Sequence, residues 1–159
     1  MRRLVVYYSY TGNTKKIADA IKEQTKSDIL ELKPQIPFSS DYQTVVDEYQ
    51  NNSIDNKEVP IKDIEINLDH YDEIIIGTPV WWYTICPVVT TFLKQNDLSN
   101  KKVYLFATNA GWLGHTFKDF EKLCQNGNSK ECLNIVFDSN QLTQLKTERL
   151  EIENWIKKL

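Results

Sequence analysis

A short polar segment near the start of the chain carries residue types that bind anions. It reads S-Y-T-G-N-T over residues 9–14. The β-branched and aromatic run before it predicts a strand over residues 3–8, and apolar residues at helical spacing after it predict a helix from about residue 13 or 14 to residue 25. The first N–H groups of such a helix and its positive dipole end face the turn. The segment therefore favours an anion as its ligand.

The side chains of this segment suit a phosphate in particular. Ser9, Thr11 and Thr14 offer hydroxyl donors, Asn13 offers an amide, and Gly12 allows the backbone a close approach or a positive φ. Taken alone, the segment also fits an ordinary N-cap ahead of a helix. The sequence lacks the known phosphate loops of other kinds: G-x-x-x-x-G-K-[ST] for nucleoside triphosphates, G-x-G-x-x-G for dinucleotides, and the phosphatase loop C-x-x-x-x-x-R. The remaining candidate ligand is the phosphate of a mononucleotide, held mainly by neutral donors. Tyr10 lies in the same segment and is included among its candidate binding residues.

A second segment is rich in aromatic residues and follows the apolar run at residues 73–77. We expect residues 78–85 to form a loop. Adjacent residues of an extended segment point to opposite sides, so one tryptophan should seal the core and the other should face the site. An aromatic ring there would stack on a planar ligand. The candidate residues of this loop are Thr78, Pro79, Val80, Trp81, Trp82 and Tyr83.

A third segment follows the apolar run at residues 103–107 and contains glycines that allow close backbone approach to a ligand. Its histidine is better explained as the start of the next helix than as a catalytic group. The candidate binding residues are Thr108, Asn109, Ala110, Gly111, Trp112, Gly114 and His115. No catalytic residue is assigned, and no metal site is expected because the cysteines and histidines lack ligand spacing.

Strand and helix patterns alternate along the chain. Strands are expected at residues 3–8, 29–32, 73–77, 103–107 and 133–137, and helices at residues 14–25, 39–51, 86–95, 116–124 and 145–159. The second helix is expected to be polar and exposed, with Ser39, Ser40 or Asp41 as its N-cap. Residues 51–69 are expected to connect two elements as a loop with extended pieces. Such alternation predicts parallel strands joined by right-handed crossovers. Because ligands of such sheets bind beyond the carboxyl ends of the strands, the three segments should converge there.

Length and charge narrow the class of protein. A chain of 159 residues suits a single domain over residues 1–159. The formal net charge of −3 argues against binding to nucleic acid. No run is long and apolar enough for a signal peptide or a membrane span, so we expect a cytoplasmic protein. The three cysteines are then expected to be reduced, since a disulfide between Cys124 and Cys132 would be unusual in the cytosol.

A phosphate at one end and a flat ring at the other describe flavin mononucleotide (FMN). The segments S-Y-T-G-N-T, G-T-P-V-W-W and T-N-A-G-W-L-G-H-T resemble the flavodoxin family, and the resemblance spans residues 3–159. It implies a three-layer α/β sandwich with a five-stranded parallel sheet in the order 2-1-3-4-5 and helices on both faces. It also implies a phosphate at residues 9–14 and an isoalloxazine ring between residues 78–83 and 108–115.

The resemblance implies an electron-transfer flavoprotein that carries electrons between a reductase and acceptor proteins. The alternative is an FMN-dependent NAD(P)H:quinone-type oxidoreductase for small acceptors, its pocket lined by Tyr83, Asn109, Trp112 and His115. The sequence leaves open whether the protein is a monomer or a dimer. A flavin-free receiver domain would need an acidic pair after the first strand, where the chain has Tyr8 and Ser9.

Two features of the sequence bear on the flavin's redox properties. Neither segment around the ring contains Lys or Arg, so the reduced, anionic flavin would lack a nearby cation and its potential should lie below that of free FMN. Many flavodoxins have a glycine in the second segment, where a peptide flips on reduction, but residues 79–83 contain none. We therefore expect weak stabilisation of the one-electron-reduced flavin.

Overall fold

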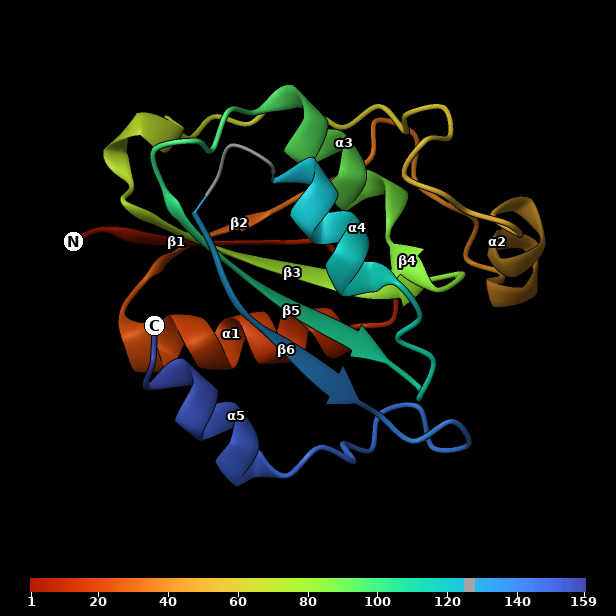
Figure 1. Ribbon diagram of the computed structural model, residues 1–159. Helices are drawn as coiled ribbons and strands as arrows, with labels where there is room; N and C mark the ends of the chain where they lie inside the picture. Colours follow the sequence, from red (N-terminus) through yellow and green to blue (C-terminus); the bar gives the residue numbers. More distant parts are fainter. Residues whose placement is uncertain (125–127) are drawn as a thin grey trace.

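A parallel β-sheet forms the centre of the computed structural model, which describes residues 1–124 and 128–159 (Figure 1). The strands run in the order β2-β1-β3-β5-β6, with a short β4 paired antiparallel to β3. The five parallel strands confirm the predicted order 2-1-3-4-5, and β4 adds to it. Their bounds are β1 Arg3–Tyr7, β2 Asp28–Glu31, β3 Glu73–Trp81, β4 Thr84–Ile85, β5 Lys102–Asn109 and β6 Asn128–Val136.

The strand β3 is longer than the sequence predicted. Its apolar run, Ile74 to Ile76, is fully buried because helices cover both faces of the sheet. The prediction ended this strand at Gly77, but the strand continues to Trp81. A Cβ at Gly77 would lie 2.2 Å from the ring of Phe106 on β5, so glycine makes room for a neighbour and does not end the strand.

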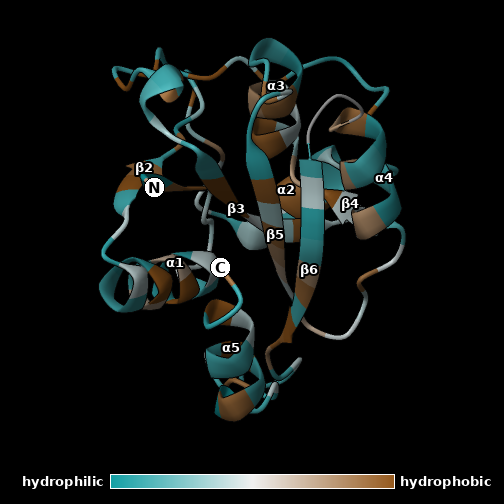
Figure 2. Ribbon diagram, turned by 60° about the vertical axis from the view of Figure 1, so that its left-hand side comes forward, coloured by the Kyte–Doolittle hydropathy of each residue, from teal (hydrophilic) through white to brown (hydrophobic). Residues whose placement is uncertain are grey.

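Helices cover both faces of the sheet, which gives the predicted three layers. Helices α1 (Asn13–Thr25) and α5 (Arg149–Ile156) lie on one face, and α3 (Pro87–Gln95) and α4 (Thr116–Leu123) lie on the other. Their apolar sides turn toward the strands (Figure 2). This packing leaves the carboxyl ends of the strands, on the side of the molecule away from both termini, free to carry a site.

The last helix begins later than predicted. The spacing of apolar residues predicted a helix from Leu145, whereas α5 begins at Arg149. Leu145 forms a bridge with Phe137, and the Thr147 hydroxyl accepts a hydrogen bond from the Val136 N–H at 2.7 Å. Residues 145–147 are therefore held by the end of β6, so the helix cannot start there.

Helix α2 (Tyr42–Glu48) occupies an unexpected place. It is shorter than the predicted helix at residues 39–51, although the expected N-cap is present, since the Asp41 carboxylate accepts from the Thr44 N–H at 3.0 Å. The helix lies beyond the carboxyl end of the sheet, not flat on one of its faces (Figure 1). It was expected to be exposed, but Val45 is buried, and this side of the helix helps to build the candidate site.

Candidate functional site

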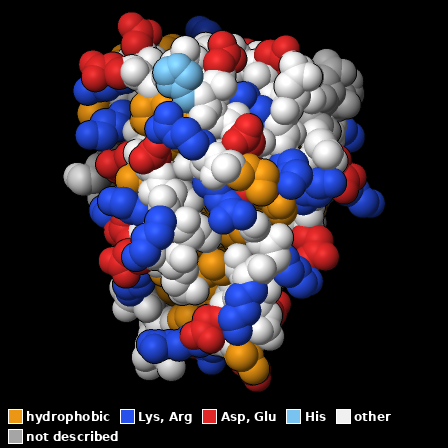
Figure 3. All heavy atoms as spheres, turned by 90° about the vertical axis from the view of Figure 1, so that its left-hand side faces the viewer, with side chains coloured by type: hydrophobic (Ala, Val, Ile, Leu, Met, Phe, Trp, Pro, Cys, Tyr) orange, Lys and Arg blue, Asp and Glu red, His pale blue; other side chains and the backbone are white. Residues whose placement is uncertain are grey.

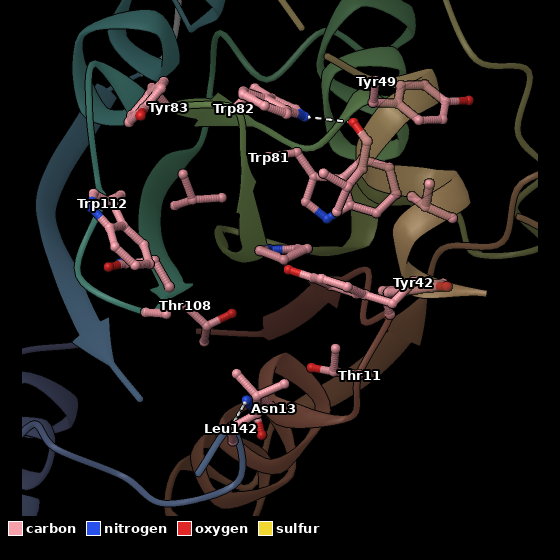
Figure 4. Close-up of a pocket in the computed structure, with 17 residues that line it drawn as sticks. Thr11, Asn13, Tyr42, Tyr49, Trp81, Trp82, Tyr83, Thr108, Trp112 and Leu142 are labelled. Carbon is pink, nitrogen blue, oxygen red and sulfur yellow. Dashed lines mark hydrogen bonds between the residues drawn. The ribbon is translucent and has the colours of Figure 1, made fainter. Parts of the chain in front are cut away.

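A pocket of about 310 Å³ opens beyond the carboxyl ends of β1, β3 and β5, and all three predicted segments reach it (Figure 4). Volumes of this order are usual for small-molecule and cofactor sites. The predicted residues that line it are Tyr10, Thr11, Asn13, Pro79, Val80, Trp81, Trp82, Tyr83, Thr108, Asn109, Ala110 and Trp112. The strand topology thus brings together residues about 100 positions apart in the chain.

The first segment forms one end of the pocket and leads into α1. Gly12 has a φ of 97°, and its N–H donates to the Ser9 hydroxyl at 3.1 Å. This turn starts α1 at Asn13, so the first N–H groups of the helix are not used within the helix. The Thr11 side chain is exposed at the same end (Figure 4). Ser9 and Gly12 shape the turn without lining the pocket.

Thr14 does not line the pocket either. It is buried, and its hydroxyl lies 2.7 Å from the hydroxyl of Thr108 at the end of β5. The pair joins the first segment to the third. Thr14 was predicted to bind the ligand together with its neighbours, whereas its hydroxyl is engaged in the core.

Two further side chains of the first segment hold other parts of the chain. The Tyr10 hydroxyl donates to the Ser39 carbonyl at 2.6 Å, and its ring stacks near Tyr42 with centroids 6.4 Å apart. The Asn13 amide donates to the Leu142 carbonyl at 2.6 Å (Figure 4). Tyr10 thereby connects the segment to the start of α2, and Asn13 connects it to the loop after β6.

The second segment is a β-hairpin, and the prediction of a loop over residues 78–85 is wrong. β3 and β4 pair through Trp81 and Thr84, so Trp82 and Tyr83 alone form the turn. Trp81 packs in an aromatic cluster with Phe38 and Tyr49, with centroids 5.0 and 5.2 Å from its ring. The Trp82 indole N–H donates to a carbonyl of α2, and Tyr83 is half exposed at the pocket edge. Trp81 packs against the core, as one tryptophan was expected to do, but both tryptophans are half-buried and both line the pocket. Trp82 belongs to the turn, so the expected alternation of an extended segment does not apply to it.

Four predicted residues support the hairpin or shape the third segment and do not line the pocket. Thr78 is fully buried, and its hydroxyl accepts from the Cys86 N–H at 3.1 Å. Gly111 lies in the turn of the third segment with a φ of 111°. Gly114 packs against Tyr83, and the His115 N–H donates to the Tyr83 carbonyl at 2.8 Å.

The side chain of His115 turns away from the pocket. His115 precedes α4 as its N-cap residue, as expected, and its Nδ1 lies 2.5 Å from the Asp119 carboxylate. The Thr84 hydroxyl donates to the same carboxylate at 2.5 Å. Burial would raise the pKa of Asp119, but the hydrogen bonds from Thr84 and His115 outweigh it and hold that pKa below its usual value.

Comparison with known proteins places the chain in a family. The family model described as flavodoxin matches residues 2–159. The chain belongs to the flavodoxin family. This membership and the strand order confirm the resemblance and the fold expected from the sequence. A search of curated proteins found no match.

Solved structures of flavodoxin-like proteins resemble the chain over most of its length. A flavoprotein from Lactobacillus acidophilus NCFM in complex with FMN is 28% identical with a TM-score of 0.67, covering 84% of this chain and 92% of that chain. A candidate flavoprotein from Bacteroides eggerthii is 26% identical with a TM-score of 0.79, covering 98% and 96%. Oxidised flavodoxin 2 from Bacillus cereus is 20% identical with a TM-score of 0.61, covering 99% and 96%, and shows the shared fold.

The residues that line the pocket of this flavodoxin-family chain are of types that suit FMN. One end offers the start of α1 and the Thr11 hydroxyl, which suit a phosphate. The other end is walled by Trp82, Tyr83 and Trp112, which suit a flat ring (Figure 4). Within residues 1–124 and 128–159, no Lys, Arg, Asp or Glu lines this pocket. Over the same residues there is no cluster of potential metal ligands and no helix long and apolar enough to cross a membrane.

Sequence reasoning missed five residues that line the pocket. Four come from one side of α2 and the residue after it, and the fifth comes from the loop after β6. They are Tyr42, Val45, Val46, Tyr49 and Leu142. The spacing of the first four, i, i+3, i+4 and i+7, marks an apolar helix face, so the pattern was available in the sequence. What the sequence did not show is that this face turns toward the pocket.

Proposed function

We propose that this flavodoxin-family protein is a single-domain FMN carrier, which passes electrons between a reductase and an acceptor protein. The observation that carries the proposal is one neutral, aromatic pocket that joins the start of α1 to the β3–β4 hairpin. The FMN in the Lactobacillus acidophilus relative supports the choice of cofactor. When bound, FMN supplies the redox chemistry, and the protein binds and orients it and controls access to it.

In this proposal the phosphate lies at residues 9–14. The backbone N–H groups at the start of α1 and the Thr11 hydroxyl donate hydrogen bonds to it. The helix dipole supplies positive potential in place of a charged side chain. Ser9 and Gly12 keep the turn in shape, and the pair of Thr14 and Thr108 holds it at the end of the sheet. The side chains of Tyr10 and Asn13 are bonded elsewhere, so these two residues contribute to the phosphate site through their backbone.

The flavin ring lies between the hairpin and the third segment in this proposal. Trp82 and Tyr83 form one wall, and residues 108–110 with Trp112 form the other. Tyr83 and Trp112 are 49% and 60% exposed, so the pocket reaches the surface through an uncharged, apolar edge. A carrier needs such an edge, because electron transfer to a partner protein requires a close approach to the ring.

A second candidate function has one observation in its favour. The side of α2 that lines the pocket adds Tyr42, Val45 and Val46, so the cavity has apolar walls on more sides than two loops would provide. Such walls suit a small planar acceptor, as in an NAD(P)H:quinone-type oxidoreductase. His115, which the sequence placed in that pocket, faces Asp119 instead.

One set of spectra separates the two functions. The purified protein is mixed with FMN and desalted, and its visible spectrum is recorded before and after anaerobic addition of NADPH. We expect flavin bands that survive desalting and do not bleach until a flavodoxin reductase is added. Rapid bleaching by NADPH alone, with turnover on adding a quinone, would establish the reductase instead. Loss of all flavin on desalting would refute FMN binding and both functions.

A further inference from the structure

The turn between β3 and β4 has an unusual backbone for its sequence. Trp82 and Tyr83 have φ values of 51° and 66°, so both central residues are left-handed, as in a type I′ turn. Such turns normally contain Asn-Gly or Asp-Gly, and bulky residues rarely adopt this conformation because Cβ approaches the following carbonyl. Strain of this kind persists only where the surrounding structure holds it.

Asn52 holds the hairpin from the side of α2. Its side chain is 9% exposed, and its amide nitrogen donates to the carbonyls of Trp81 and Ile85, each at 3.1 Å. One amide thus bridges both strands of the hairpin. The same side also receives the Trp82 indole, whose N–H donates to the Val46 carbonyl at 3.0 Å. Asn52 belongs to the connecting segment at residues 51–69, to which the sequence assigned no role.

The start of α4 holds the hairpin from the opposite side. The Thr84 hydroxyl donates to Asp119, which is 5% exposed, and the His115 N–H donates to the Tyr83 carbonyl at 2.8 Å. Gly114 fits against the turn so closely that a Cβ there would lie 2.3 Å from the Tyr83 Cβ. Asp119 also pairs with His115 and with Lys122 at 3.5 Å, so its position on α4 is fixed.

We propose that Asn52 and Asp119 are positioning residues that clamp the Trp82–Tyr83 turn between them and preform one wall of the cofactor pocket. The proposal rests on the proposed function, because it takes this turn as a wall of the FMN site. Rotation of the peptide between Trp82 and Tyr83 would send Trp82 into backbone space that only glycine enters readily. The clamp therefore keeps one backbone conformation, and FMN binds without having to order the turn.

Two substitutions release the clamp, each with a matched control. Asn52→Leu removes the bridging amide at nearly constant size, and Asn56→Leu alters an exposed asparagine of the same segment. Thr84→Val removes the hydroxyl that reaches Asp119 but leaves the pairs of Asp119 with His115 and Lys122. Thr90→Val removes another buried threonine hydroxyl, on α3, and Thr84→Ser should restore the hydrogen bond to Asp119.

The first readout needs no cofactor. Hydrogen exchange of the indole N–H groups is followed by NMR, with Trp155, whose N–H donates to the Glu131 carbonyl at 3.2 Å, as internal reference. Asn52→Leu leaves the Trp81 and Ile85 carbonyls without this donor, and Thr84→Val does the same to the Asp119 carboxylate. The turn should then open more often, so exchange at Trp82 should become about tenfold faster in each variant. Exchange at Trp155 should stay within about twofold, and the two controls and Thr84→Ser should resemble the parent protein.

The second readout is FMN affinity. The dissociation constant should rise about tenfold in Asn52→Leu and Thr84→Val and return toward the parent value in Thr84→Ser. Unchanged exchange at Trp82, or equal acceleration at Trp155, would overturn the clamp, as would unchanged FMN affinity. If the parent protein retains no FMN, the proposed function fails by that result alone, and exchange still decides whether the turn is clamped.

Discussion

At the scale of single residues, neighbouring hydroxyls of one short segment have different surroundings. Thr11 is exposed and lines the pocket, whereas Thr14 is buried and bonded to Thr108. In the sequence, both read as phosphate donors. The difference follows from the start of α1, because Thr14 lies inside the first turn and its side chain faces the sheet. Their substitutions should therefore have separable effects.

We expect Thr11→Ala to weaken FMN binding by about 1.5–3 kcal/mol, the usual contribution of a hydrogen bond to a charged group, without changing the free energy of unfolding. Thr14→Ala should lower the free energy of unfolding of the cofactor-free protein by about 1–3 kcal/mol, because it leaves the Thr108 hydroxyl buried without this partner. Titration calorimetry with FMN and urea unfolding measure the two quantities. Thr143→Ala, at an exposed site outside the pocket, is the control. Unchanged FMN affinity in Thr11→Ala would remove Thr11 from the phosphate site.

At the scale of elements, the turn of the β3–β4 hairpin contains residues that disfavour its backbone conformation but provide an aromatic binding surface. Asparagine or glycine would suit the left-handed backbone of Tyr83 better, but neither offers an aromatic face to the pocket. A residue that lowers stability at a binding site is a common compromise between stability and function. Because Tyr83 is 49% exposed, its replacement sacrifices little burial.

Tyr83→Asn should accordingly raise the free energy of unfolding of the cofactor-free protein by about 1 kcal/mol, since asparagine tolerates the left-handed region. The same substitution should weaken FMN binding by about 0.5–1.5 kcal/mol through loss of an aromatic contact. Thermal unfolding and FMN titration provide both values. Tyr42→Asn is the control, because Tyr42 also lines the pocket but begins a helix and has no left-handed strain to relieve. A destabilised Tyr83→Asn would show that the turn is not strained.

At the scale of the whole molecule, charge is separated from the pocket. The end of the molecule away from the site carries acidic and basic side chains side by side (Figure 3), including the ion pair of Arg2 with Asp28. Within the described residues, the side chains that line the pocket are uncharged. A net charge of −3 gives the molecule only a weak overall field for attracting a basic partner. The immediate surroundings of the ring therefore matter more than the overall field.

With no cationic side chain lining the pocket in the described part of the chain, the negative charge of reduced flavin is poorly stabilised. We expect the midpoint potential of bound FMN to lie below that of free FMN in a spectroelectrochemical titration. Trp112→Lys places a cation at the exposed ring end of the pocket and should raise the potential, by about 1 kcal/mol in free-energy terms after solvent screening. A bound flavin that is easier to reduce than free FMN would contradict this account.

The sequence by itself determined the alternation of strands and helices and the three segments that meet at the pocket, whereas the sheet order was implied by the resemblance to the flavodoxin family. These depend on local patterns: buried apolar runs, helical spacing and glycine-containing turns, each carried by a few adjacent residues. Thus the start of α1 agrees with the sequence within about a residue, and Asp41 is one of the three expected N-cap candidates, although α2 begins at Tyr42 and not at residue 39. The residue types of the segments indicated FMN, and the resemblance to the flavodoxin family then assigned the phosphate and the ring to particular segments.

Only the tertiary structure decided what each side chain contacts. Gly77 reads as the end of a strand until the ring of Phe106 is seen against it, and α2 reads as an exposed helix until its apolar side meets the pocket. The hairpin turn and the two bonds of Asn52 likewise depend on partners about 30 residues away. Such contacts are fixed by how distant elements pack, and a pattern of adjacent residues carries no information about that packing.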